Sequence, residues 1–159
     1  MVLLVQRRKY NLLYELRFDA GINYKKENVG ASLNTTCPDG IDVYFDNVGG
    51  FVTDEVLKRI NAGARIAICG QVSQYNLKEP ELGPRNLFHL TKSQAKMEGF
   101  LVFAYQARYD EGLHRLSKWI KQDKLIYKED IVVGIKNAPQ TFIGMLNGKN
   151  LGKTLIKVS

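Results

Sequence analysis

Three places in the sequence put polar and glycine residues directly after a short apolar run. IDVYFD is followed by Asn47 and a Gly-Gly pair, ARIAIC by polar residues that end in Tyr75, and AGIN by Tyr24 and two lysines. Open parallel sheets bind ligands at the carboxyl ends of their strands, and glycines there let the backbone approach a ligand. These three strand ends are therefore candidate positions for a ligand-binding site. The structural alternative is that Gly-Gly is a plain turn and that a lone tyrosine packs.

Nucleophilic and metal-dependent chemistry have little support in the sequence. The only histidines are His89 and His114, and the only cysteines are Cys37 and Cys69. These four residues form neither a disulfide framework nor a ligand cluster at metal spacing. Cys69 lies at the end of a predicted strand and could be reactive, yet no basic partner stands near it in the sequence.

The glycine-rich turn that binds a dinucleotide diphosphate is absent from the sequence. That turn needs a strand, glycines spaced as in G-x-G-x-x-G, and then a helix N-terminus. None of the fourteen glycines fits this spacing. Gly144, Gly148 and Gly152 recur every four residues near the end of the chain, where we expect them to cap a helix and open a strand.

The elements that must position these residues alternate between strand and helix patterns. Apolar runs predict strands over 2–5, 20–24, 41–46, 64–69, 97–105, 127–134 and 151–158, and helical spacing predicts helices over 7–17, 25–36, 52–62, 87–93, 109–123 and a short segment that begins near Pro139. We expect 41–46 and 64–69 to be central strands, and Leu113, Leu116, Trp119 and Ile120 to face inward. This alternation predicts an α/β fold with a mostly parallel sheet.

Composition and charge narrow the class of protein. The chain has 159 residues, of which 45% are hydrophobic and 25% charged, as in a globular domain with a core of its own. The net charge of +7 comes from dispersed basic residues, which favours a solvated surface or a site for one small anionic cofactor over nucleic-acid binding. No apolar run is long enough to span a membrane, and the start MVLLVQRRKY reverses the order of a secretory signal. We therefore expect a cytoplasmic protein.

Four segments in order, DVYFDNVGG, ARIAICGQVSQYN, KMEGFLVFAY and GMLNGKNLGKTLIKV, change this general picture. With them the chain resembles the zinc-independent medium-chain dehydrogenases/reductases, in particular the group of prostaglandin reductases, alkenal/one oxidoreductases and curcumin reductases. The resemblance runs from about Lys9 to Ser159. It implies the C-terminal part of an NADP-binding Rossmann domain, a doubly wound sheet that here lacks its first strand and glycine-rich turn. The last 15–20 residues or so would return toward a GroES-like domain that this sequence does not contain.

The resemblance also implies particular site residues. The cofactor-binding residues it implies are Lys9 and Tyr24, at the 2′-phosphate of NADPH; Asn47; the loop Cys69, Gly70, Gln71, Val72, Ser73, Gln74 and Tyr75, beside the nicotinamide and its ribose; Phe100, Leu101 and Val102; and Asn150. Tyr75 is the implied catalytic residue, whose hydroxyl hydrogen-bonds the cofactor or the substrate carbonyl. No metal is implied.

The family reaction is NADPH-dependent reduction of the carbon–carbon double bond of α,β-unsaturated ketones and aldehydes. We expect such an enone or enal as substrate of a longer, homodimeric enzyme, and this chain alone to be inactive. The alternative is a non-catalytic fragment that retains only a cofactor lobe or a dimerisation strand. One departure from the family is Arg17, which stands where the family usually has a glycine in L-G-F-D. This position ends the first helix and favours a left-handed conformation, so an arginine there is strained.

Overall fold

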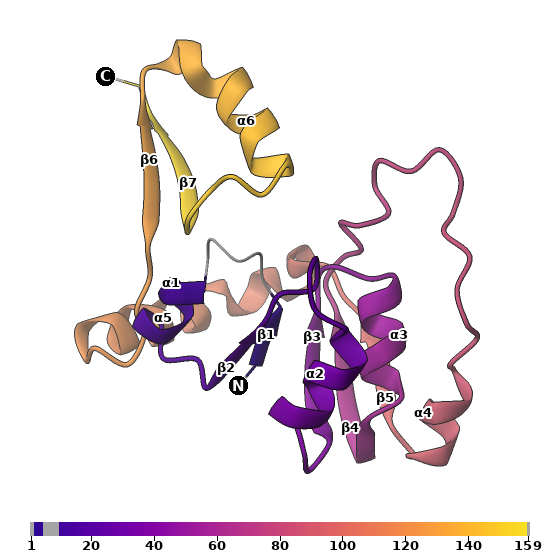
Figure 1. Cartoon of the computed structure of the whole chain (residues 1–159). Coiled ribbons are helices and arrows are strands. Elements are labelled where there is room, and N and C mark those ends of the chain that lie inside the picture. Colours follow the sequence, from indigo (N-terminus) through magenta and orange to yellow (C-terminus); the bar gives the residue numbers. More distant parts are fainter. Residues whose placement is uncertain (1, 5–9, 159) are drawn as a thin grey trace.

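Seven strands and six α-helices, with two short 3₁₀ segments, alternate along residues 2–4 and 10–158, the part of the chain that the computed structural model describes (Figure 1). In chain order they are β1 (Val2–Leu4), α1 (Tyr10–Glu15), β2 (Ala20–Ile22), α2 (Val29–Thr36), β3 (Ile41–Asp46), α3 (Phe51–Leu57), β4 (Ile60–Ile68), α4 (Phe88–Lys92), β5 (Lys96–Gly99), the 3₁₀ segment η2 (Val102–Arg108), α5 (Tyr109–Lys121), β6 (Glu129–Val133), the 3₁₀ segment η3 (Ile135–Asn137), α6 (Ala138–Leu146) and β7 (Lys153–Lys157). The predicted α/β architecture is confirmed.

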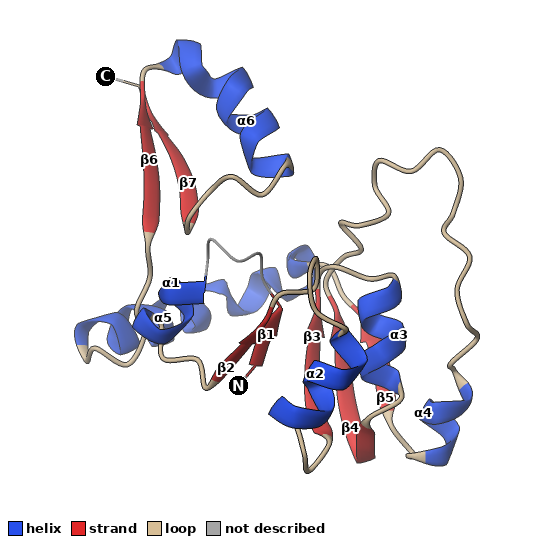
Figure 2. Ribbon diagram, viewed as in Figure 1, coloured by secondary structure: helices blue, strands red, loops and turns tan. Residues whose placement is uncertain are grey.

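Every strand pair in the described residues is parallel. The strands form three hydrogen-bonded groups in the orders β1-β2, β3-β4-β5 and β6-β7 (Figure 2). A doubly wound sheet has the strand order 3-2-1-4-5-6, in which β2 and β1 match positions 3 and 2, and β3, β4 and β5 match positions 4, 5 and 6. Among the described residues no strand occupies position 1, as the predicted partial Rossmann fold requires.

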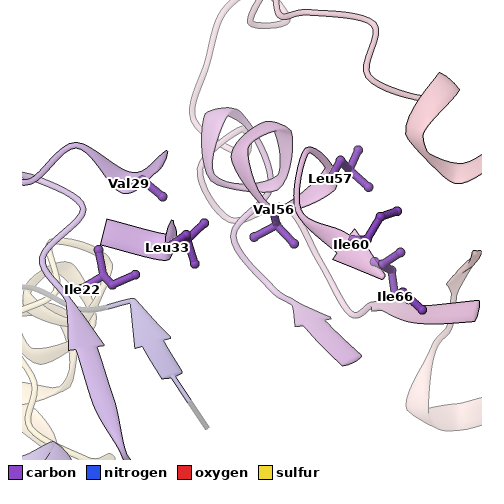
Figure 3. Close-up of a cluster of buried hydrophobic side chains, with 8 residues drawn as sticks. Ile22, Val29, Leu33, Val56, Leu57, Ile60 and Ile66 are labelled. Atoms are coloured by element: carbon purple, nitrogen blue, oxygen red, sulfur yellow. The ribbon is translucent and has the colours of Figure 1, made fainter. Parts of the chain in front are cut away.

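The core lies where α2 and α3 pack against β2 and β4. Its buried side chains come from all four elements: Ile22, Val29, Leu33, Val56, Leu57, Ile60, Ala64 and Ile66 (Figure 3). Helix α3 contributes Val52, Val56 and Leu57, which helical spacing places on one face. The helix predicted over 52–62 ends at Leu57, because Ile60 pairs with Ile41 and so begins β4.

The strand predicted over 97–105 is wrong in its second part. Strand β5 stops at Gly99, and Val102–Arg108 is a 3₁₀ segment. The neighbouring β4 ends at Ile68, which pairs with Gly99, so no partner strand continues beyond that point. An apolar sequence alone does not reveal where its partner stops.

Helix α5 has the predicted amphipathic pattern without the predicted burial. Leu113, Leu116, Trp119 and Ile120 are all exposed, and α5 has no buried residue. The expectation that they face inward is therefore wrong for the described structure, because η2 contacts α5 but leaves these side chains exposed.

Strands β6 and β7, with α6 between them, form a separate β-α-β unit that stands apart from the other strands in Figure 1. Pro139 lies in the first turn of α6, as predicted. An ion pair between Lys128 Nζ and Glu15 Oε2, 3.0 Å apart, connects the segment just before β6 to α1.

Arg17 has the left-handed conformation that the family resemblance implies for its position, with φ of 61°. The Phe18 N–H donates to the Leu13 carbonyl and the Arg17 N–H to the Tyr14 carbonyl, the pair of bonds that closes a helix around a left-handed residue.

Within the described residues, no helix combines the length and apolar character that a membrane span requires.

Candidate functional site

The turn after β3 is built around a buried carboxylate. Asp46 is completely buried, and its Oδ1 accepts hydrogen bonds from the N–H groups of Val48 and Gly49, both at 2.9 Å. The Thr53 hydroxyl, from the first turn of α3, donates to the other oxygen, Oδ2. Gly49 and Gly50 both have positive φ, at 72° and 63°, so this turn requires glycine at the two positions.

Burial also affects the phenol next to this carboxylate. It raises the pKa of Tyr44 well above its usual value, and the negative charge of Asp46 raises it further. Tyr44 therefore remains protonated and neutral at physiological pH. The Asp46 carboxyl accepts hydrogen bonds from two backbone N–H groups and a hydroxyl.

The loop after β4 is bonded to this turn along its backbone. The N–H groups of Cys69 and Gly70 donate to the Asp46 carbonyl oxygen, at 2.7 and 3.2 Å. Further along, the Val72 N–H donates to the Asn47 carbonyl at 3.2 Å, and the Ser73 N–H and hydroxyl donate to the Val48 carbonyl at 3.1 and 2.6 Å. The two segments, 46–50 and 69–75, thus form one connected surface at the ends of β3 and β4.

Two polar side chains converge over Gly70 on this surface. A β-carbon placed on Gly70 would lie 2.6 Å from the Tyr75 hydroxyl oxygen and 2.8 Å from Asn47 Oδ1. The Tyr75 hydroxyl accepts the Gln71 N–H at 3.2 Å, which leaves its own hydrogen to donate. Asn47 and Tyr75 are both exposed, so an amide and a phenol are available to hydrogen-bond a carbonyl or carboxamide of a ligand.

The end of β5 reaches the same edge of the sheet. The Phe100 N–H donates to the Ile68 carbonyl at 3.2 Å, and the Phe100 ring lies 6.2 Å from the ring of Phe45. Leu101 and Val102 follow and are exposed. A groove of about 510 Å³ borders the site on the side of α3 and of the long loop 69–87 that joins β4 to α4; its lining includes Gly50, Thr53, Gln71 and Gln74.

The structure brings together only some of the residues predicted for the site. Asn47, the loop 69–75 and Phe100 meet at adjoining strand ends. Tyr24 follows β2, where it packs against the core. Asn150 precedes β7 in the separate unit, with its amide donating to the Gly152 carbonyl at 2.9 Å. Lys9 lies outside the described residues.

Sequence reasoning missed Asp46 and Thr53, the two side chains that hold the first turn. An available signal was the position of Asp46 at a strand end, followed by a turn, because aspartate side chains commonly bond N–H groups two or three residues further on. Among the described residues, no group of three or more His, Cys, Asp or Glu side chains is placed to hold a metal ion.

Comparison with known proteins identifies the family. Residues 16–156 match the family described as zinc-binding dehydrogenase. The chain is 45% identical over 143 residues to the NADP⁺-dependent 2-alkenal reductase of Nicotiana tabacum, and 42% identical over 149 residues to the NADPH-dependent curcumin reductase of Escherichia coli K12. These alignments cover 89% and 91% of this chain but only 41% and 43% of the relatives.

A solved structure gives the same result. The crystal structure of CurA from Vibrio vulnificus in complex with NADPH superposes with a TM-score of 0.92 at 38% identity, over 99% of this chain and 49% of that one. The chain belongs to the zinc-binding dehydrogenase family. Within it, the chain falls in the medium-chain dehydrogenase/reductase group that the sequence motifs predict. It spans less than half the length of the relatives it matches.

Proposed function

We propose that this chain is the C-terminal, NADP-binding part of an enzyme that uses NADPH to reduce the carbon–carbon double bond of α,β-unsaturated ketones and aldehydes. The observation that carries the proposal is the convergence of the Asn47 amide and the Tyr75 hydroxyl over Gly70, on two turns that the backbone bonds together. Relatives that bear the names 2-alkenal reductase and curcumin reductase support the reaction class, and a neighbour solved with NADPH supports the cofactor.

The residues present fit a nicotinamide cofactor. Because Gly70 has no side chain, the Asn47 amide and the Tyr75 hydroxyl lie close over its backbone, where both can hydrogen-bond one ligand. Bound NADPH would supply a hydride to the β-carbon of the substrate, and a proton is then added at the α-carbon. The Tyr75 hydroxyl would donate a hydrogen bond to the substrate carbonyl oxygen, where negative charge develops during the reduction.

The remaining site residues stay part of the proposal. We assign Lys9 and Tyr24 to the 2′-phosphate, Phe100, Leu101 and Val102 to the nicotinamide side, and Asn150 to a further cofactor contact. Residues 1–159 would form the C-terminal part of the Rossmann domain, with the last 15–20 or so directed toward a GroES-like domain. We further propose that the enzyme is a cytoplasmic homodimer and that it acts on prostaglandin-like enones.

A second candidate is a non-catalytic fragment that serves only as a cofactor lobe or a dimerisation module. The absence of a G-x-G-x-x-G turn from all 159 residues favours it, because that turn supplies the main diphosphate contacts in dinucleotide-binding folds. For the same reason we expect the isolated chain to bind NADPH only weakly.

Titration of the ¹⁵N-labelled chain with NADPH separates the two candidates. The reductase proposal expects shifts of amide signals at 47–50 and 69–75 that saturate at high cofactor concentration. Shifts elsewhere only, or none, would favour the non-catalytic fragment.

In an enzyme that contains this chain, Tyr75→Phe should lower kcat about 10²-fold with little effect on cofactor affinity, because one donor to the developing oxyanion is lost. Unchanged kcat would remove Tyr75 from that role.

A further inference from the structure

Asp46 is a fully buried carboxylate whose bonds lead outward to the candidate site. We propose that Asp46 is a positioning residue, which fixes the turn 47–50 in the shape that holds Asn47 and Tyr75 together over Gly70. The proposal rests on the proposed function, since it assigns a role to a residue behind the cofactor-binding surface.

The carboxylate determines the path of the turn. A single oxygen, Oδ1, accepts two successive N–H groups, from Val48 and Gly49 at 2.9 Å each, so the backbone must curl around it. The Thr53 hydroxyl holds the other oxygen and so ties the turn to the start of α3. These three bonds fix the carboxylate from two sides.

The turn 47–50 also determines where the loop 69–75 lies. Carbonyl oxygens of Asp46, Asn47 and Val48 accept the N–H groups of residues 69, 70, 72 and 73. A turn that loses its central carboxylate therefore moves three acceptors on which the loop 69–75 depends. Tyr75 sits on that loop, four residues beyond the N–H that its hydroxyl accepts.

The surroundings of Asp46 distinguish a positioning role from a role in stability alone. Asp46 does not belong to the apolar cluster around α2 and α3, whose members pack below the turn. Its side chain accepts hydrogen bonds from groups of the turn and of the first helical turn after it, and it also interacts with the neighbouring Tyr44 hydroxyl. Both N–H groups need an acceptor at one position, and a neutral amide oxygen at that position also accepts two hydrogen bonds.

The test compares three variants of the 159-residue chain: Asp46→Ala, Asp46→Asn and Thr53→Val. The readouts are urea unfolding, the NMR signals of the Gly70 amide and the Tyr75 ring, and the NADPH titration. We expect Asp46→Ala to weaken NADPH binding about tenfold or more and to shift both signals, because small displacements at a binding site are costly. Asp46→Asn should restore affinity to within about threefold of the unmodified chain, since its Oδ1 accepts the same two N–H groups. Thr53→Val should weaken NADPH binding less than Asp46→Ala does, because the two bonds to the turn remain and only the bond to the first turn of α3 is lost.

Two results would overturn the proposal. One is an Asp46→Ala chain that folds and keeps both the affinity and the Gly70 and Tyr75 signals of the unmodified chain. The other is an Asp46→Asn chain that folds but loses as much affinity as the alanine variant is expected to lose, and this test stands even where the alanine variant fails to fold. If the unmodified chain shows no response to NADPH, the proposed function fails, while the Gly70 and Tyr75 signals of the variants still decide the role of Asp46.

Discussion

The two halves of the described chain differ sharply in burial. Every buried residue that the structure describes lies between Leu13 and Ile66, and residues 67–158 contain none. Helix α3 has seven residues and buries three of them, whereas α5 has thirteen and buries none. The difference does not follow helix length or amphipathic pattern, since α5 has a clear apolar face.

What separates the halves is the presence of a covering surface. The apolar face of α3 lies against α2 and the strands, so its side chains leave water. The apolar face of α5 is bordered by η2, which leaves its side chains exposed. An amphipathic pattern therefore indicates which face of a helix must be covered, and only the surrounding structure supplies the cover. The candidate site lies where the well-packed half ends, on turns anchored to β3 and β4.

The largest expected effect tests this contrast with the same substitution in both halves. Leu33, in α2, is 2% exposed and Leu113, in α5, is 62% exposed. Leu33→Ala should lower the free energy of unfolding by about 2–5 kcal/mol, because it leaves a cavity in the core. Leu113→Ala should change it by less than about 0.5 kcal/mol, as for other exposed sites. Urea unfolding of the two variants measures both values, and equal losses would show that α5 is packed in solution.

The next prediction concerns the site at the border between the halves. Gly70→Ala places a methyl group 2.6 Å from the Tyr75 hydroxyl, so the tyrosine or Asn47 must move. We expect NADPH binding to weaken about tenfold, the effect of roughly 1.4 kcal/mol. The matched control is Gly99→Ala at the end of β5, where no atom outside the neighbouring residues lies within 4 Å of the added carbon. NADPH titration of both variants is the measurement, and the same affinity for the two would separate Gly70 from the site.

The exposed half also offers a surface for self-association, which bears on the proposed homodimer. Leu101, Val102 and Phe103 are 70%, 56% and 76% exposed and follow directly after the edge strand β5. Apolar segments beside an open sheet edge recruit further chains. We expect the unmodified chain to be larger than a monomer in light scattering, and Val102→Lys to shift it toward the monomer.

Leu82→Lys is the control for that experiment. Leu82 is 97% exposed but lies in the long loop before α4, away from the edge of β5 in sequence. The Leu82→Lys substitution adds the same charge outside the segment 101–103. A monodisperse monomer of the unmodified chain would contradict the proposed homodimer, and equal effects of the two lysines would point to net charge instead.

The sequence allowed good prediction where local signals agreed with the packing. The strand 41–46 has the predicted bounds, because Pro38 and Gly40 mark a turn before it and the Gly-Gly pair marks a turn after it. The segment 97–105 failed because its apolar residues continue beyond the last residue of β4 that can pair with them. The end of a partner strand is a property of the tertiary structure and leaves no mark on the segment itself.

The site was predictable to a similar depth. The rule for strand ends placed Asn47 and the loop 69–75 near one another, and the structure bonds these segments together. The convergence over Gly70 depends on how the loop folds back, with the Tyr75 hydroxyl on the Gln71 N–H, which spacing does not specify. Asp46 escaped notice because its role depends on burial, and burial is decided by α3 and the neighbouring loop.

The smallest expected effect concerns Arg17, at the end of α1, where the sequence alone predicted a strained backbone. Its φ of 61° costs an ordinary residue about 1 kcal/mol relative to glycine. Its guanidinium donates to the Asp123 carbonyl at 3.2 Å, an exposed bond between the two halves. Arg17→Gly removes both the strain and the bond, whereas Arg17→Ala removes the bond and keeps the strain. We expect Arg17→Gly to raise Tm by about 2–4 °C in a thermal melt, and Arg17→Ala to leave it unchanged or slightly lower. A lower Tm for both variants would mean that the contact with Asp123 stabilises the chain by more than the left-handed backbone destabilises it, and the two halves would then be coupled at this point.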